Sequence, residues 1–136
     1  MPIEDDAAIK EILKRSKAIA VVGASPKPGR DSGTIADYLA RRGYNVIPVN
    51  PAYPEIFGMK CFPDLTSIGA HVDIVDIFRR PDEVMPIVEE AIKIHAGTVW
   101  MQLDVVNEDA ARRAEEAGLN VIMDRCIAVE FRRLVQ

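Results

Sequence analysis

Small and basic side chains follow a short apolar run near the start of the chain. Gly23, Ala24 and Ser25 come directly after the run, and Lys27 and Arg30 follow them. A hydroxyl, backbone N–H groups and two cations at the start of a helix suit a phosphate, because the helix dipole adds partial positive charge there. We interpret residues 23–30 as a phosphate-binding loop for a nucleotide-type cofactor. An ordinary strand-to-helix turn with surface cations fits the same residues.

The loop departs from the dinucleotide fingerprint G-x-G-x-x-G, which would need glycines at Ser25 and Pro28. Asn50 and Pro51 end the next apolar run, where NAD sites usually carry Asp or Glu for the ribose hydroxyls. Because an uncharged amide does not repel a phosphate, this pattern counts mildly against NAD and allows a ligand phosphorylated on its ribose. Asn50 can equally cap a turn, which is the commoner role of Asn-Pro.

Two adjacent arginines and a glutamine follow later apolar runs. Phe78, Arg79 and Arg80 end the third run, and Gln102 ends the fourth. Adjacent guanidinium groups can bind a phosphate bidentately, and the Gln102 amide can meet an amide of a ligand. We assign a ligand role to one of the two arginines. The alternatives are one exposed and one ion-paired arginine, and a Gln102 that satisfies loop backbone.

The two cysteines offer a weaker signal. Cys61 and Cys126 form no CxxC pair, and neither histidine has metal-ligand spacing to them. Cys61 lies in residues 51–65, a long segment rich in proline and aromatic residues that fits either a wall for adenine or pantetheine or a loop packed on itself. Cys126 begins the last predicted helix beside Arg125, a setting that can activate a thiol. We interpret both cysteines as structural.

Five apolar runs, separated by helical patterns, supply the elements that position these groups. Strands are predicted over 18–23, 45–49, 73–78, 98–102 and 120–123, an amphipathic helix over 5–16 and a helix after the loop over 34–42. The alternation predicts the α/β class: a doubly wound, Rossmann-like parallel sheet of five strands with helices on both faces. We predict the strand order 3-2-1-4-5. The ligand then belongs at the carboxyl ends of strands one and four, where the winding reverses.

Length and charge narrow the class of protein. The 136 residues, 49% of them hydrophobic, fit one domain over 1–136, with a helix in 1–17 packed on it. A net charge of −4 argues against a nucleic-acid binder. The acidic N-terminus lacks an apolar signal core, and no apolar run approaches the ~20 residues of a membrane span. We expect a cytoplasmic protein with reduced thiols and no membrane partner.

Five segments, in order, resemble the stand-alone CoA-binding domain proteins: Val-Val-Gly-Ala-Ser (21–25), Pro-Val-Asn-Pro (48–51), Val-Asp-Ile-Val-Asp-Ile-Phe-Arg-Arg (72–80), Val-Trp-Met-Gln (99–102) and Asp-Arg-Cys (124–126). These proteins are similar to the CoA-binding domain of succinyl-CoA synthetase α subunits and of ADP-forming acyl-CoA synthetases. The resemblance implies a Rossmann-like fold that binds coenzyme A, with phosphate at residues 23–25 and with Lys27 and Arg30 nearby. It further implies that Asn50 and Pro51 lie under the nucleotide, residues 78–80 along the pantetheine or phosphates, and the thiol end toward Gln102.

The synthetases add a second domain with a phosphorylated histidine and an ATP-grasp module, and neither histidine of this sequence lies in a recognisable phosphohistidine loop. We therefore expect a module that carries or senses CoA or acyl-CoA without chemistry of its own. The alternatives are an NAD(P)-binding small oxidoreductase or redox sensor, and a subunit of a split acyl-CoA synthetase. The expected protein partners are a second copy of the chain or a synthetase-type subunit.

Overall fold

A parallel sheet of five strands forms the centre of the computed structural model, which describes all residues from 1 to 136. The strands are short and almost fully buried, as expected for a parallel sheet covered on both faces. Their order across the sheet is β2-β1-β5-β6-β7, and every neighbouring pair is parallel. Their bounds are β1 Ala18–Val22, β2 Asn45–Val49, β5 Ile74–Ile77, β6 Thr98–Met101 and β7 Asn120–Ile122.

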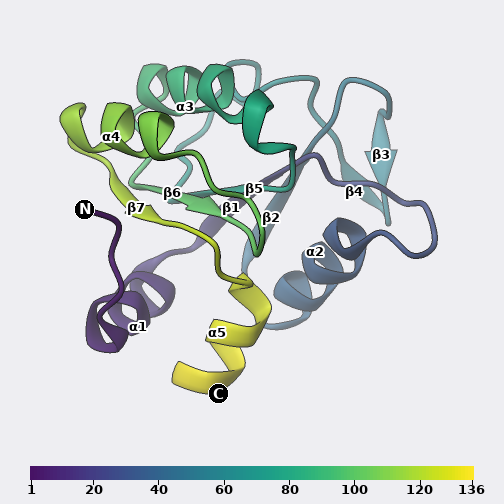
Figure 1. Ribbon diagram of the computed structural model, residues 1–136. Coiled ribbons are helices and arrows are strands. Elements are labelled where there is room, and N and C mark those ends of the chain that lie inside the picture. The colour runs from purple at the N-terminus through teal and green to yellow at the C-terminus, as the bar shows by residue number, and fades with distance from the viewer.

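Helices cover both faces of this sheet (Figure 1). The helices α3 and α4 pack on one face, and α1, α2 and α5 pack on the other. Their bounds are α1 Asp6–Arg15, α2 Asp31–Arg41, α3 Val84–Lys93, α4 Glu108–Glu116 and α5 Ile127–Leu134, with a 3-10 turn η1 at Pro81–Glu83 before α3. The α/β, doubly wound class predicted from the sequence is confirmed. No helix combines the length and the apolar character needed to cross a bilayer.

Local sequence explains where several helices begin. The side chain of Asp5 accepts the Ala8 N–H at 3.0 Å and caps α1. Asn107 caps α4 in the same way through the Ala110 N–H at 2.9 Å. The helix after the phosphate-binding loop begins at Asp31, three residues earlier than the predicted Thr34.

The placement of the third predicted strand was wrong. Residues 74–77 lie between β1 and β6 and not outside β2, so the five strands follow the order 2-1-3-4-5. Outside β2 the chain makes only one parallel bridge, between Val49 and Phe62. Counted with Phe62 as a third strand reduced to one residue, the sheet has the predicted winding 3-2-1-4-5 and continues with β7. The long segment 51–65 therefore holds the outer position that we gave to residues 73–78.

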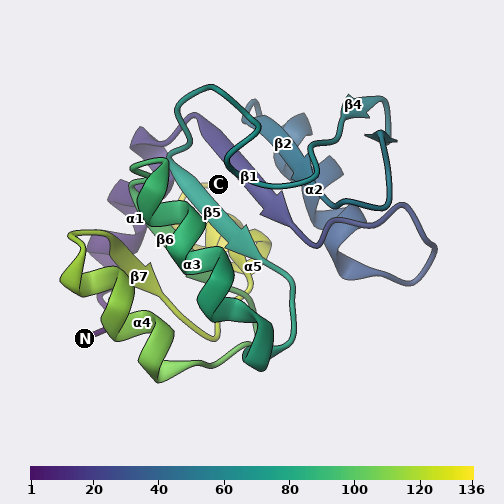
Figure 2. The ribbon, with the colours of Figure 1, turned by 90° about the horizontal axis from the view of Figure 1, so that it is seen from above.

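That segment also forms a small antiparallel hairpin, β3 Glu55–Ile56 and β4 Met59–Lys60. In Figures 1 and 2 the hairpin stands beside α2 and the loop that precedes it. Ile56 is fully buried and Cys61 nearly so, while Phe57 at the tip is 54% exposed. The hairpin thus forms one side of the region where the predicted site residues gather.

Candidate functional site

The predicted site residues lie at the carboxyl edge of the sheet, where β1 and β5 end side by side (Figure 2). The chain leaves β1 toward β2 and then returns to the opposite side of β1 to form β5. Ligands of open α/β sheets usually bind in the crevice outside such a reversal. The sequence placed this reversal between strands one and four; the structure has it between the first and third main strands, β1 and β5.

Gly23 lies directly against the loop that follows β5. Its φ is +89°, and its N–H donates to the Val49 carbonyl at 2.9 Å. A Cβ at this position would lie 2.4 Å from the Phe78 carbonyl oxygen and 2.9 Å from Cδ of Arg79. Only glycine fits, because both the left-handed conformation and the space exclude a side chain. The loops after β1 and β5 therefore touch at Gly23.

The loop after Gly23 runs directly into the first turn of α2. Ala24 is fully buried, and the Ser25 hydroxyl oxygen accepts the Lys27 N–H at 3.2 Å. The Ser25 hydroxyl proton remains free to be donated. A Cβ on Gly33 would stand 2.2 Å from the Ser25 carbonyl oxygen, so α2 packs against the loop backbone. Gly33, which was not selected from the sequence, thus allows α2 to lie against the backbone of residue 25.

The N-terminus of α2 carries no capping side chain. The residue before the helix is Arg30, which makes no side-chain cap hydrogen bond. The first backbone N–H groups of any helix lack partners within the helix. With the helix dipole, these free donors favour an anion at this end of α2.

A cavity of about 500 Å³ opens between the start of α2 and the loops after β5 and β6. Six of the predicted site residues line it, namely Gly23, Arg30, Phe78, Arg79, Arg80 and Gln102. Its wall also includes residues that the sequence analysis did not assign to the site: Asp31, Ser32, Ile35, Pro81, Glu83, Leu103, Asp104, Val105 and Cys126. Most of these become recognisable only once the loop ends are brought together. We call this space the central cavity.

A second cavity of about 390 Å³ lies on the other side of Gly23 and Arg79, against α3. Pro51 lines it, as predicted for a residue near the nucleotide. Its charged lining is one arginine, Arg79, against four carboxylates, Asp64, Asp82, Glu83 and Glu90. The central cavity instead has three arginines, Arg30, Arg79 and Arg80, against Asp31, Glu83 and Asp104. Phosphates are therefore better matched on the α2 side of Gly23 than on the α3 side.

The two arginines after β5 share one acidic neighbour. The Arg79 guanidinium lies 3.7 Å from Glu83, and that of Arg80 lies 3.5 Å from Glu83 and 3.7 Å from Asp82. These separations are long for ion pairs, and the side chains are 39% and 76% exposed. Arg79 lines both cavities and touches the Gly23 position, whereas Arg80 lines the central cavity alone. Of the two arginines after β5, Arg79 is thus the one that lies against the phosphate-binding loop.

Asn50 acts on the loop backbone. Its side-chain nitrogen donates to the Ala24 carbonyl at 2.9 Å, and its side-chain oxygen accepts the Ala52 N–H at 2.9 Å. The hydrogen bond to Ala52 shows that Asn50 caps a turn, which was the alternative role given to it from the sequence. The same side chain also ties the end of β2 to the loop after β1. Lys27 is exposed and lines neither cavity.

Gln102 is buried at the floor of the central cavity. Its side-chain oxygen accepts the Ile127 N–H at 3.0 Å and so caps α5 in place of Cys126, which makes no side-chain cap. No hydrogen bond engages the Gln102 amide nitrogen. Gln102 therefore satisfies a backbone N–H group through its oxygen, as the alternative interpretation expected, and its amide nitrogen keeps both N–H donors free at the cavity wall. Trp100, in β6, donates its ring N–H to the Arg125 carbonyl at 2.8 Å and fixes the same turn.

Cys61 and Phe57, both in the segment 51–65, differ in their exposure to solvent. Cys61 is buried under the hairpin, and burial raises the pKa of its thiol. The ring of Phe57 stands 2.7 Å from the Cβ position of Gly33 and remains half exposed above the start of α2. Phe57 could have been selected from the sequence because it is an aromatic residue that precedes a glycine, Gly58, in a proline-rich segment. No three histidine, cysteine, aspartate or glutamate side chains are arranged to hold a metal ion.

Comparison with known proteins identifies the family. The sequence profile of the CoA binding domain matches residues 17–132. The chain is 44% identical over 123 residues to the Bacillus subtilis (strain 168) protein YneT, with 90% of this chain and 91% of YneT covered. A solved structure, a hypothetical protein from Pyrococcus horikoshii OT3, superposes with a TM-score of 0.96 at 45% identity and covers 100% of this chain and 97% of that one.

A third relative is an enzyme. The chain is 30% identical over 129 residues to ADP-forming acetate–CoA ligase I of Archaeoglobus fulgidus. The match covers 88% of this chain and 19% of the ligase, so it spans about a fifth of that enzyme's length. The chain belongs to the CoA-binding domain family, whose members include domains of ADP-forming acetyl-CoA synthetases.

Proposed function

We propose that this chain binds coenzyme A or acyl-CoA as one carrier or sensor domain, without catalysis of its own. The observation that carries the proposal is the uncapped start of α2, held against the glycine turn at Gly23 where the sheet reverses, in a chain of the CoA-binding domain family. The diphosphate accepts hydrogen bonds from the α2 N–H groups and from Ser25. Arg30 and Arg79 supply positive charge beside it.

The two cavities give the ligand a direction. The adenosine lies toward Pro51 and the hairpin, since Asn50 ties that edge to the loop and presents no carboxylate. The diphosphate stays on the α2 side of Gly23, away from the four carboxylates of the second cavity. The pantetheine follows the central cavity past Phe78, Arg79 and Arg80 toward Gln102, whose free amide nitrogen suits a pantetheine carbonyl.

A second candidate is a subunit that completes an acyl-CoA synthetase supplied by another chain. The match to the Archaeoglobus fulgidus ligase supports it. Co-purification of a second chain bearing an ATP-binding module would favour this candidate over a carrier or sensor. The two free cysteines fit a cytoplasmic setting for either one.

Calorimetric titration with CoA, dephospho-CoA, NAD and NADP tests the binding proposal. We expect CoA to bind and NAD to fail, because no carboxylate stands at the end of β2 for the ribose hydroxyls. Ser25→Asp should weaken CoA binding by at least about tenfold, through repulsion of the diphosphate. Aspartate keeps an acceptor for the Lys27 N–H, so the turn should survive.

Ala70→Asp is the matched control, since it adds the same charge at an exposed position before β5, at the opposite edge of the sheet. It should leave CoA affinity unchanged. Equal CoA affinity in Ser25→Asp and the natural protein would remove the diphosphate from this loop. Binding of NAD or NADP in place of CoA would make an oxidoreductase the better proposal.

A further inference from the structure

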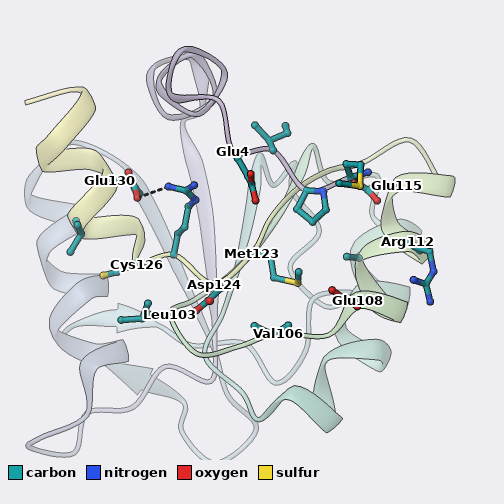
Figure 3. A pocket seen from close by; sticks show the side chains of 16 residues that line it. Glu4, Leu103, Val106, Glu108, Arg112, Glu115, Met123, Asp124, Cys126 and Glu130 are labelled. Atoms are coloured by element: carbon teal, nitrogen blue, oxygen red, sulfur yellow. Dashed lines mark hydrogen bonds and ion pairs between the residues drawn. The ribbon is translucent and has the colours of Figure 1, made fainter.

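An apolar groove of about 760 Å³ lies beside the segment that follows the outer strand β7, between residues 1–4, α4, α5 and the loop after β6 (Figure 3). Five large hydrophobic side chains of the protein are exposed, and four of them line this groove: Met1, Leu103, Val106 and Val129. Met123 lies between them in the middle of the groove (Figure 3). So much exposed apolar surface in one concave place indicates a binding site.

The groove and the central cavity share part of their walls. Leu103 and Cys126 line both spaces. Figure 3 shows these two residues at one end of the groove, with Arg112 and Glu115 at the other. A ligand that follows the central cavity past Gln102 therefore reaches Leu103 and Cys126, the two residues that also line the groove.

The charges around the groove select against an anionic occupant. Five carboxylates line it, from Glu4, Glu108, Glu115, Asp124 and Glu130. The lining cations already have partners, since Arg125 lies 3.2 Å from Glu130, the Met1 ammonium lies 2.7 Å from Glu115, and Arg112 pairs with Asp109. A free fatty acid or the second carboxylate of a dicarboxylic acyl group would be repelled. An uncharged hydrocarbon chain would not.

The strand beside the groove is partly closed to a second protein chain. The Ile3 N–H donates to the Val121 carbonyl at 2.7 Å, so the N-terminal segment occupies part of the free edge of β7. Adding a strand from another molecule needs that edge unpaired. The contact makes a small ligand a better occupant of the groove than a second copy docked by strand addition.

We propose that the groove holds the acyl chain of an uncharged aliphatic acyl-CoA. The inference rests on the proposed binding of CoA and adds a substrate class to it. The thioester lies near Gln102 and Cys126, and the hydrocarbon passes over Leu103 to Val106, Met123 and Val129. The domain then distinguishes medium-chain acyl-CoA from free CoA through contacts that free CoA cannot make.

Calorimetric titration with CoA and with acetyl-, butyryl-, hexanoyl-, octanoyl- and succinyl-CoA tests this assignment. Affinity should rise from acetyl to octanoyl by up to about fourfold for each methylene buried. Succinyl-CoA should gain nothing over acetyl-CoA. Val106→Asp and Val129→Asp should abolish the rise with chain length. Both should leave CoA affinity unchanged, because neither residue lines the central cavity.

Ala70→Asp again serves as the charge control and should keep the chain-length dependence. A flat response to chain length with normal CoA binding would overturn the acyl assignment and leave the proposed function standing. Failure of CoA and of every acyl-CoA to bind would overturn both. Sedimentation velocity completes the test: a natural dimer that Val106→Asp or Val129→Asp converts to a monomer would make the groove a self-association surface instead.

Discussion

Asp73 and Asp76 stand three residues apart and have opposite surroundings. The carboxylate of Asp73 accepts the N–H groups of Lys17 and Ala18, each at 2.9 Å. Burial acts to raise the pKa of Asp73, but these hydrogen bonds outweigh it and the pKa is lowered. Asp76 is fully buried beside Val21 and Trp100, and neither of its carboxylate oxygens has a partner. Burial raises the pKa of Asp76 well above the ordinary value.

The buried Asp76 predicts a fall in stability as pH rises. The unfolded chain ionises Asp76 near the ordinary pKa of 3.8, whereas the folded chain keeps the proton to a higher pH. Between those two values the free energy of unfolding should decrease by up to about 1.4 kcal/mol per pH unit. Asp76→Asn should lack this fall, which urea unfolding from pH 4 to pH 8 would measure.

Asp73→Asn is the control for that measurement. The lowered pKa of Asp73 stabilises the natural protein at pH values above the ordinary pKa of aspartate. This contribution is lost as the pH falls through the pKa of Asp73 in the folded state. Asp73→Asn should therefore lose stability at neutral pH and leave the fall above pH 4 in place. Parallel unfolding curves for Asp76→Asn and the natural protein would show that Asp76 is already ionised in the fold.

At the scale of elements, α2 lacks the stabilising side-chain cap that a helix N-terminus usually has. The helix has Arg30 where Ser, Thr, Asp or Asn would satisfy an N–H group. By contrast, Asp5 and Asn107 cap α1 and α4. An uncapped terminus facing the central cavity is what a ligand-binding helix requires, since a capping side chain would compete with the ligand for the same donors.

Arg30→Ser should therefore raise the stability of the fold while it lowers the affinity for CoA. A serine cap should raise the free energy of unfolding by about 1 kcal/mol. CoA affinity should fall by about 10- to 100-fold, because the cap occupies a donor and the guanidinium is lost. Arg30→Ala, which removes the charge without capping the helix, should change stability little and bind CoA better than Arg30→Ser. A stabilised Arg30→Ser with unchanged CoA affinity would show that the ligand does not use this terminus.

At the scale of the whole molecule, the two halves of the sheet meet at the candidate site. The first half supplies Gly23 and α2, and the second supplies Phe78, Arg79 and Gln102. Neither half contains the central cavity by itself. A ligand bound there touches both halves and stabilises the folded chain over the unfolded chain.

Thermal unfolding should reveal that linkage. CoA at 100 times its Kd should add about 2.7 kcal/mol to the free energy of unfolding, and scanning calorimetry should show a Tm higher by several degrees. NAD at the same concentration should leave Tm unchanged. An equal rise with both ligands would indicate a general nucleotide site, and no rise with CoA would count against binding at the junction of the two halves.

The sequence predicted which residues end the strands better than it predicted which segments lie beside one another in the fold. Apolar runs, Gly23 and the paired arginines are local signals, and most of the residues chosen from them line the two cavities. The outer position beside β2 is held by Phe62, a single paired residue with no strand pattern of its own. Since this occupant could not be recognised from the sequence, residues 74–77 were assigned to the outer position and not to their place beside β1. Gly33 and Leu103 were missed because their roles arise from contacts with distant segments.

The single bridge at Phe62 has a consequence for motion. Only two backbone hydrogen bonds hold the outer segment to β2, from Asn50 to the Phe62 carbonyl at 2.9 Å and from Phe62 to the Pro48 carbonyl at 3.0 Å. Segments held by so few bonds open locally without unfolding of the whole protein. Amide protons in the hairpin should thus exchange with solvent far sooner than those of β1. If adenosine lies against residues 51–62, the rate at which this outer segment opens sets how long the ligand stays bound.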